Sequence, residues 1–268
     1  MIESPVINII NESIPKTLYG FPKEGIIAEN RIIKVGDGAT KQTLYAKLYR
    51  TQYELLYEII GYLIAHHLEL PQPKAFVTLL NQDDQRRLFN IQHPKTNKYP
   101  VWATESLTGE SAWFHYGHCS DALKKDLKKW FNLYGTVAFD DFVGNIDRNL
   151  TNLIRESSGK YHLIDHGKLF GGRTYKTKKV HANEFTKNLL GEACIPAQSL
   201  RRQEKSPILN IAQHASRHAD AFEKSKPELY YWWSRLAKGH ERKLYNYLSE
   251  RSKIETHIIQ RKYGLLAI

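Results

Sequence analysis

The spacing of apolar residues changes partway along the chain, and this change constrains the fold more than any other feature. Before about residue 103, most apolar residues lie in short runs between polar turns, a pattern typical of β-strands. The exception is 52–68, where they recur at helical spacing. Beyond about residue 110 the spacing is mostly helical. We therefore predict an α+β protein with a small lobe at 1–103 (an antiparallel sheet with one helix), a link at 104–109 and a mainly helical lobe at 110–268.

Two strand pairs are expected in the small lobe. The strands 31–35 and 44–49 flank a Gly-Asp-Gly turn at 36–38, which predicts a β-hairpin. The apolar runs 75–80 and 87–91 flank a polar turn and predict a second pair of strands. The sequence leaves open whether the first 25 residues join this sheet.

The large lobe is expected to contain one hairpin among its helices. Ser120 is a suitable N-cap for a helix that the apolar spacing extends through Val137. The apolar runs 150–154 and 161–164 flank a Ser-Ser-Gly turn, which predicts the hairpin. The remainder indicates helices, chiefly at 207–223 and 226–249.

The composition narrows the class of protein without identifying an activity. The 268 residues are 41% hydrophobic, enough apolar material for a packed core, which excludes global disorder. The two cysteines are too few for a disulfide scaffold or a cysteine-rich zinc site. Since the chain has neither an apolar run of about 18 residues nor a signal-peptide pattern, we expect a cytoplasmic protein with no membrane partner.

The chain is basic, with 39 Lys and Arg against 28 Asp and Glu and a formal net charge of +11. Such an excess attracts phosphate-bearing or acidic partners, and it is equally the charge of a solvated surface. Because the basic residues are spread along the chain rather than gathered in one tail, the charge by itself does not indicate nucleic-acid binding. Nucleic acid is therefore an allowed but not a favoured partner.

The most informative motif joins three oxygen-bearing side chains. Asp147 and Asn152 lie in Gly-Asn-Ile-Asp-Arg-Asn-Leu-Thr-Asn, and Asp165 follows in Ile-Asp-His-Gly. Phosphoryl transfer needs a carboxylate near the attacking hydroxyl, and amide and carboxylate oxygens that hold Mg²⁺ against the phosphates. We predict Asp147 as the base or hydroxyl-orienting residue, and Asn152 and Asp165 as Mg²⁺ ligands. Asp, Asn and Gly also form ordinary turns, but the combination favours the functional interpretation.

This motif resembles that of the HipA-like kinases, particularly the short stand-alone forms, and more distantly those of phosphatidylinositol kinases and eukaryotic-type protein kinases. The resemblance covers most of 30–170 and is strongest at 139–167. It implies a two-lobed protein-kinase-like fold, ATP and Mg²⁺ between the lobes, and a serine/threonine protein substrate. It also raises the hypothesis of a toxin-type kinase with an antitoxin or regulatory partner. Arg148 agrees with the HipA-like pattern, whereas Asn149 stands where relatives often have His.

A kinase of this kind also needs a strand-borne cation for the phosphates and a helix-borne Glu that positions it. Lys47 lies in the middle of the expected strand 44–49, and we predict that it binds phosphate. Glu58, on the apolar side of the following helix, is the predicted partner of Lys47. Glu54 is the alternative, although at the helix start it could be only a dipole-favoured acid.

The remaining ATP-binding candidates come from the Gly-rich turn and the expected hinge. Gly36 and Gly38 would cover the phosphates, although an ordinary hairpin turn explains them equally well. The resemblance implies that Glu105 and Leu107 lie in the hinge that contacts adenine, an assignment that depends on chain order alone. Thr40 and Thr43 lie beside the Gly-rich turn, and we hypothesise that they are autophosphorylated.

Two other functions stay open at this point. A phosphoinositide or small-molecule kinase would share the same ATP site. A non-catalytic pseudokinase that binds nucleic acid through its basic residues would bind with a steep salt dependence and without ATP turnover. The complete set of Asp147, Asn152 and Asp165 argues against the pseudokinase, since a degenerate site need not keep all three.

Overall fold

The structure, a computed structural model, describes residues 5–22, 29–38, 41–112, 120–172, 181–194 and 205–263. Contacts divide the chain into two compact units. The sheet unit comprises 1–55 and 73–107, and the helical unit comprises 56–72 and 108–268. The division between Leu107 and Thr108 lies inside the expected link. It differs from the predicted lobes in one respect, because 56–72 groups with the helical unit; the lobe assignment itself stays a prediction.

The sheet unit contains a six-stranded sheet of strand order β1-β5-β6-β4-β3-β2. β3 and β4 form the predicted hairpin in antiparallel register. The N-terminal residues join the sheet at both edges, because β1 pairs parallel to β5 and β2 pairs antiparallel to β3. The strand bounds are β1 Asn8–Ile10, β2 Lys16–Gly20, β3 Glu29–Val35, β4 Gln42–Leu48, β5 Ala75–Leu80 and β6 Tyr99–Glu105.

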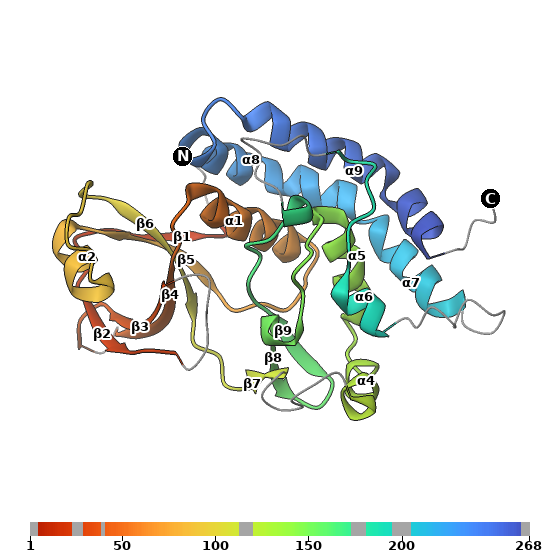
Figure 1. Cartoon of the computed structure of the whole chain (residues 1–268), viewed down its shortest axis with the longest axis horizontal. Helices are drawn as coiled ribbons and strands as arrows, with labels where there is room; N and C mark the ends of the chain where they lie inside the picture. The colour runs from red at the N-terminus through yellow and green to blue at the C-terminus, as the bar shows by residue number, and fades with distance from the viewer. Residues whose placement is uncertain are drawn as a thin grey trace. The chain divides into compact units, whose positions relative to one another are not determined.

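One face of this sheet packs against helix α2, Gln82–Phe89 (Figure 1). Leu88 and Phe89 of α2 share a buried apolar cluster with the alternating residues of β3 and β4. The predicted strand at 87–91 is therefore wrong. Asn81 accepts a hydrogen bond from the Asp84 N–H at 2.8 Å, and this cap starts a helix where polar residues suggested only a turn. β5 pairs instead with β6.

The helical unit contains most of α1, a small sheet and the remaining helices. Its sheet has the order β7-β8-β9, and the pairing of β8 with β9 confirms the predicted hairpin. α9 packs against both α7 and α8, and α7 and α9 contact α5 (Figure 1). The bounds are α1 Gln52–His67, β7 Glu110–Ser111, α4 Asp121–Leu127, α5 Leu133–Val143, η2 Leu150–Asn152, β8 Leu153–Ser157, β9 Lys160–Leu163, η3 Phe170–Gly172, α6 Leu189–Cys194, α7 Lys205–Ala215, α8 His218–Leu236 and α9 Glu241–Lys262.

Several helices begin or end at other residues than the sequence predicts. Ser120 caps α4, but the chain then leaves the helix in successive turns, so the expected single helix is α4 and α5. A turn at Ser216 and Arg217 separates α7 from α8, and α8 continues through Pro227. The burial of Phe222 and Leu229 on either side of this proline stabilises one continuous helix. No helix in the described ranges is long and apolar enough to cross a membrane.

Candidate active site

A left-handed glycine at the end of α5 directs the chain into the loop that carries Asp147. Gly144 has φ +63°, and a Cβ added to it would lie 2.9 Å from the Tyr247 hydroxyl oxygen. Glycine is therefore needed for both the backbone conformation and the close approach. The next residue, Asn145, donates from Nδ2 to Asp140 Oδ1 at 2.9 Å and accepts the Asp147 N–H at 3.0 Å. Asn145 thus fixes the loop to the buried end of α5.

Asp147 and Asn152, predicted as catalytic partners, are in direct contact. Asn152 Nδ2 donates to the backbone carbonyl of Asp147 at 2.5 Å. Asn149 Nδ2 donates to Asp147 Oδ1 at 3.2 Å, and its own Oδ1 accepts the Thr151 N–H at 2.8 Å, which caps η2. Asp147 is half-buried and Asn152 is 5% exposed. Because the Asn152 nitrogen is held by the backbone, its Oδ1 is the side-chain atom with acceptor capacity for a cation.

Arg148 joins the two segments that carry the candidate catalytic residues. It is 1% exposed, and its Nε lies 3.2 Å from Asp140 Oδ2. Its Nη1 donates to the backbone carbonyls of Asn152 and Ile164. Its Nη2 lies 3.0 Å from His166 Nδ1. Since a guanidinium can only donate, His166 Nδ1 is the acceptor, so the neutral imidazole carries its proton on Nε2.

Asp140 is the buried anion that balances Arg148. Both side chains are fully buried. Burial raises the pKa of the Asp140 carboxyl to about 6, whereas the charge of Arg148 and the Asn145 hydrogen bond act to lower it. A buried ion pair of this kind stabilises the loop only while both partners are present.

Asp165 and the residue after it connect this loop to helix α1. Asp165 has φ +61°, a conformation uncommon for a non-glycine residue, and its Oδ1 accepts the Gly167 N–H at 3.3 Å. The His166 N–H donates to Glu58 Oε2 at 2.7 Å, and Glu58 is fully buried. A Cβ added to Gly61 would lie 2.5 Å from His166 Cβ, so α1 approaches this segment as closely as a glycine allows.

The predicted pairing of Glu58 with Lys47 stays a prediction. Lys47 belongs to the sheet unit, where it lies half-buried in β4 on the face opposite the buried Ala46 and Leu48. Glu58 belongs to the helical unit, where it binds the His166 N–H. The alternative, Glu54, accepts a hydrogen bond from the Thr51 hydroxyl at 2.7 Å, a local contact typical of a helix start.

The other ATP-binding candidates also lie in the sheet unit. Gly36 and Gly38 have φ of +92° and +53° in the β3–β4 connection. Glu105, at the end of β6, accepts a hydrogen bond from Gln42 at 2.6 Å, and Leu107 follows half-buried. Their contact with nucleotide remains a prediction. Of the two hypothesised phosphorylation sites, Thr43 lies in β4 and Thr40 lies outside the described residues.

Sequence reasoning missed three residues that organise this site, namely Asp140, Asn145 and Arg148. Two of them belong to the motif itself, and only their neighbours were assigned roles. The signal for Asp140 was its place in an apolar helix, in Phe-Asp-Asp-Phe, because a carboxylate there needs a buried partner.

The residues present fit a Mg²⁺ ion shared with phosphate. Asn152 Oδ1 and the Asp165 carboxylate are oxygen donors on adjoining segments, and Mg²⁺ commonly binds one or two such groups together with substrate phosphates. Within the described part of the chain, no group of three or more His, Cys, Asp or Glu side chains could hold a metal ion.

Comparison with known proteins supports the fold. No family model matches the chain, and no sequence among the curated proteins matches it. Among solved structures, it is similar to the crystal structure of the Helicobacter pylori proinflammatory kinase CtkA, with a TM-score of 0.50 and 12% sequence identity. The match covers 98% of this chain and 100% of that chain. The chain therefore has a two-lobed, kinase-like α+β fold, as predicted.

Proposed function

We propose that this protein is an ATP-dependent phosphotransferase that transfers the γ-phosphoryl group of ATP to a hydroxyl group. The observation that carries the proposal is the hydrogen bond between Asn152 and the backbone carbonyl of Asp147, in a loop that Arg148 ties to the Asp165 segment. It keeps the predicted hydroxyl-orienting carboxylate and the two predicted metal ligands on one hydrogen-bonded framework. The kinase-like fold supports the same reaction class.

Each residue has a distinct task in this proposal. Asp147 accepts a hydrogen bond from the attacking hydroxyl and orients it, or takes its proton. Asn149 holds the Asp147 carboxylate through Oδ1, which fixes its direction. Asn152 Oδ1 and Asp165 would hold Mg²⁺, which neutralises negative charge on the phosphates when it is bound.

Two further tasks belong to residues whose placement toward nucleotide is itself a proposal. Lys47 contacts the phosphates, and Glu58 positions Lys47 while it also binds the His166 N–H. Gly36 and Gly38 lie over the phosphates, and Glu105 and Leu107 lie along adenine.

The finer assignment is a serine/threonine protein kinase of HipA-like type. It rests on the order Asn-x-Asp-Arg-x-x-x-Asn followed by Ile-Asp-His-Gly. A toxin role with an antitoxin partner is part of the same assignment. It predicts that induced expression arrests growth and that Asp147→Asn relieves the arrest.

The test is to incubate the purified protein with γ-labelled ATP and Mg²⁺, alone and with cell lysate, and to analyse protein and lipid fractions separately. Asp165→Asn removes a proposed metal ligand. Asp121→Asn is the matched control, because Asp121 in α4 has a 90% exposed side chain.

Label on serine or threonine that is lost in Asp165→Asn and kept in Asp121→Asn is the expected result. Label only in lipid or a small molecule would contradict the protein substrate and favour the small-molecule kinase. The absence of both ATP binding and ATP turnover would contradict the proposal. Salt-sensitive nucleic-acid binding would then favour the non-catalytic pseudokinase.

A further inference from the structure

Residues 181–188, which lie beyond η3 in the chain, are held by helix α9 through their backbone. Arg251 Nη1 donates two hydrogen bonds, one to the Ala182 carbonyl at 2.6 Å and one to the Glu184 carbonyl at 2.7 Å. Lys262 Nζ donates to the Thr186 carbonyl at 2.8 Å. Asn188 Nδ2 donates to the Val137 carbonyl of α5 at 2.8 Å. Three hydrogen bonds donated by α9 and one accepted by α5 thus fix four points along this short segment.

The same segment is connected to the candidate catalytic loop. The Ile146 N–H donates to the Lys168 carbonyl at 3.3 Å, and the Gly171 N–H donates to the Gly144 carbonyl at 2.8 Å. A Cβ added to Gly171 would lie 3.7 Å from Thr186 Cγ2, within van der Waals contact. Residues 168–172 therefore lie between the loop of Asp147 and the segment 181–188.

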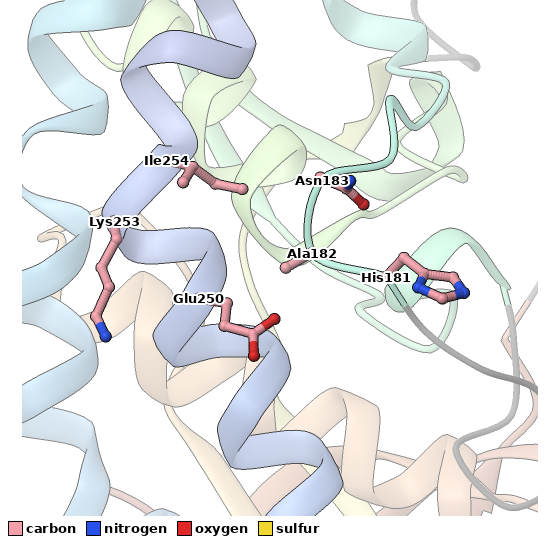
Figure 2. A pocket seen from close by; sticks show the side chains of 6 residues that line it. All are labelled: His181, Ala182, Asn183, Glu250, Lys253 and Ile254. Carbon is pink, nitrogen blue, oxygen red and sulfur yellow. The ribbon is translucent and has the colours of Figure 1, made fainter.

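Between this segment and α9 lies an open pocket of about 470 Å³, lined by His181, Ala182, Asn183, Glu250, Lys253 and Ile254. Figure 2 shows the Glu250 carboxylate and the Ile254 side chain directed toward the segment, whereas the Lys253 amino group is directed away from it. Glu250 is exposed and, within the described residues, its carboxylate makes no hydrogen bond or ion pair. Within the described residues, the pocket therefore presents the unpaired carboxylate of Glu250 beside the apolar side chains of Ala182 and Ile254.

We propose that this pocket binds a lysine or arginine side chain of the protein substrate and that Glu250 is its specificity-determining residue. The inference rests on the proposed function and names the substrate class of that site. The proposal rests on charge complementarity. The Glu250 carboxylate can pair with the cation of a lysine or arginine, while Ile254 contacts the aliphatic part of that side chain. The backbone bonds from Arg251 and Lys262 hold the wall of the pocket in a fixed place relative to the catalytic loop.

The test uses a library of serine- and threonine-containing peptides in which each position near the acceptor is varied in turn. The full-length protein is compared with Glu250→Gln, Glu250→Lys and the matched control Glu241→Gln, which changes another glutamate of α9 outside the pocket. The readout is the ratio of phosphorylation with Lys or Arg to that with Ala at each position. Binding of fluorescent cationic and acidic peptides is measured separately by anisotropy, because it does not need turnover.

The wild type and Glu241→Gln are expected to favour Lys or Arg at one position by about twofold to fivefold, the range of an exposed ion pair. Glu250→Gln abolishes this preference, and Glu250→Lys reverses it toward Asp or Glu. Lys253→Gln keeps the cationic preference, since its amino group points away.

A preference that is unchanged in Glu250→Lys, or a fall in turnover that is equal for all peptides, would overturn the pocket assignment and leave the phosphotransferase intact. If no peptide is phosphorylated, the proposed function fails for protein substrates. The binding measurement then decides the pocket separately, because equal affinity of wild type and Glu250→Lys for the cationic peptide overturns it.

Discussion

Asp140 and Asp141 are neighbours in α5, both fully buried, and they organise different parts of the helical unit. Asp140 binds Arg148, eight residues along the chain, and so supports the candidate catalytic loop. Asp141 accepts hydrogen bonds from Lys262 and Tyr263 at the end of α9, and its backbone carbonyl accepts one from Arg251. The first cluster is local in sequence, whereas the second joins residues more than a hundred positions apart.

The two clusters also differ in the pKa values of their buried acidic groups. Burial raises the pKa of Asp140 to about 6, against the charge of Arg148. In the second cluster, burial raises the pKa of Glu255 to about 8, although Arg251 Nε lies 2.7 Å from its carboxylate. Burial also raises the pKa of the Tyr263 hydroxyl, which stays protonated and donates to Asp141. The candidate catalytic loop is thus held by a compact ion pair, and residues 182–186 by a broader network.

The largest expected effect comes from breaking the first cluster. Arg148→Ala leaves Asp140 as an unpaired buried carboxylate, and we expect it to lower the free energy of unfolding by about 3–5 kcal/mol. Urea denaturation monitored by circular dichroism measures the change. Arg148→Met combined with Asp140→Leu removes both charges and should restore much of the loss; a single variant as stable as wild type would contradict this view of the pair.

A second comparison concerns two glycines beside these clusters. Gly61 lies against His166, which contacts Arg148, and Gly191 lies against Tyr263, which contacts Asp141. A Cβ added to Gly61 meets His166 Cβ at 2.5 Å, close to the backbone, and a Cβ added to Gly191 meets the Tyr263 hydroxyl at the same distance. We expect Gly61→Ala to cost about 1–3 kcal/mol of unfolding free energy, and Gly191→Ala less, because a side-chain tip can move. Thermal denaturation gives both values.

Gly20→Ala is the control for this pair, since nothing lies within 4 Å of a Cβ added there. Its effect should stay within about 0.5 kcal/mol. Equal destabilisation by Gly61→Ala and Gly20→Ala would show that α1 does not pack against His166 as described.

A further expected effect is a pH dependence in the second cluster. The pKa of Glu255 is about 8 in the folded state, above the ordinary value of 4.5, so folding favours its protonated form. Its contribution to stability is present below about pH 4.5 and is lost as the pH rises through 8. The stability of Glu255→Gln relative to wild type should therefore increase as the pH rises from 5 to 8.5. Urea denaturation of both proteins at the two pH values measures this change. A difference that does not change with pH would contradict the raised pKa.

The same contrast explains what the sequence could predict. The sequence predicts Asp147, Asn152 and Asp165 as one site because they lie close together along the chain and their residue types suit a known chemistry. The hydrogen bonds from Arg251 and Lys262 to the backbone of 182–186 could not be predicted, because the sequence of α9 does not indicate which distant carbonyls its cations contact. The β3–β4 and β8–β9 hairpins followed from their glycine turns. The strand expected at 87–91 failed because the capping by Asn81 outweighed a short apolar run.

The most direct test of the central claim, that Asp147 lies at a phosphoryl-transfer site, is the turnover of Asp147→Asn with γ-labelled ATP and Mg²⁺. The measurement is made beside wild type and Asp121→Asn, with folding verified by circular dichroism. Because a positioned base contributes about 100-fold or more, we predict that Asp147→Asn loses at least that factor while Asp121→Asn keeps wild-type turnover. Wild-type turnover in folded Asp147→Asn would contradict the account.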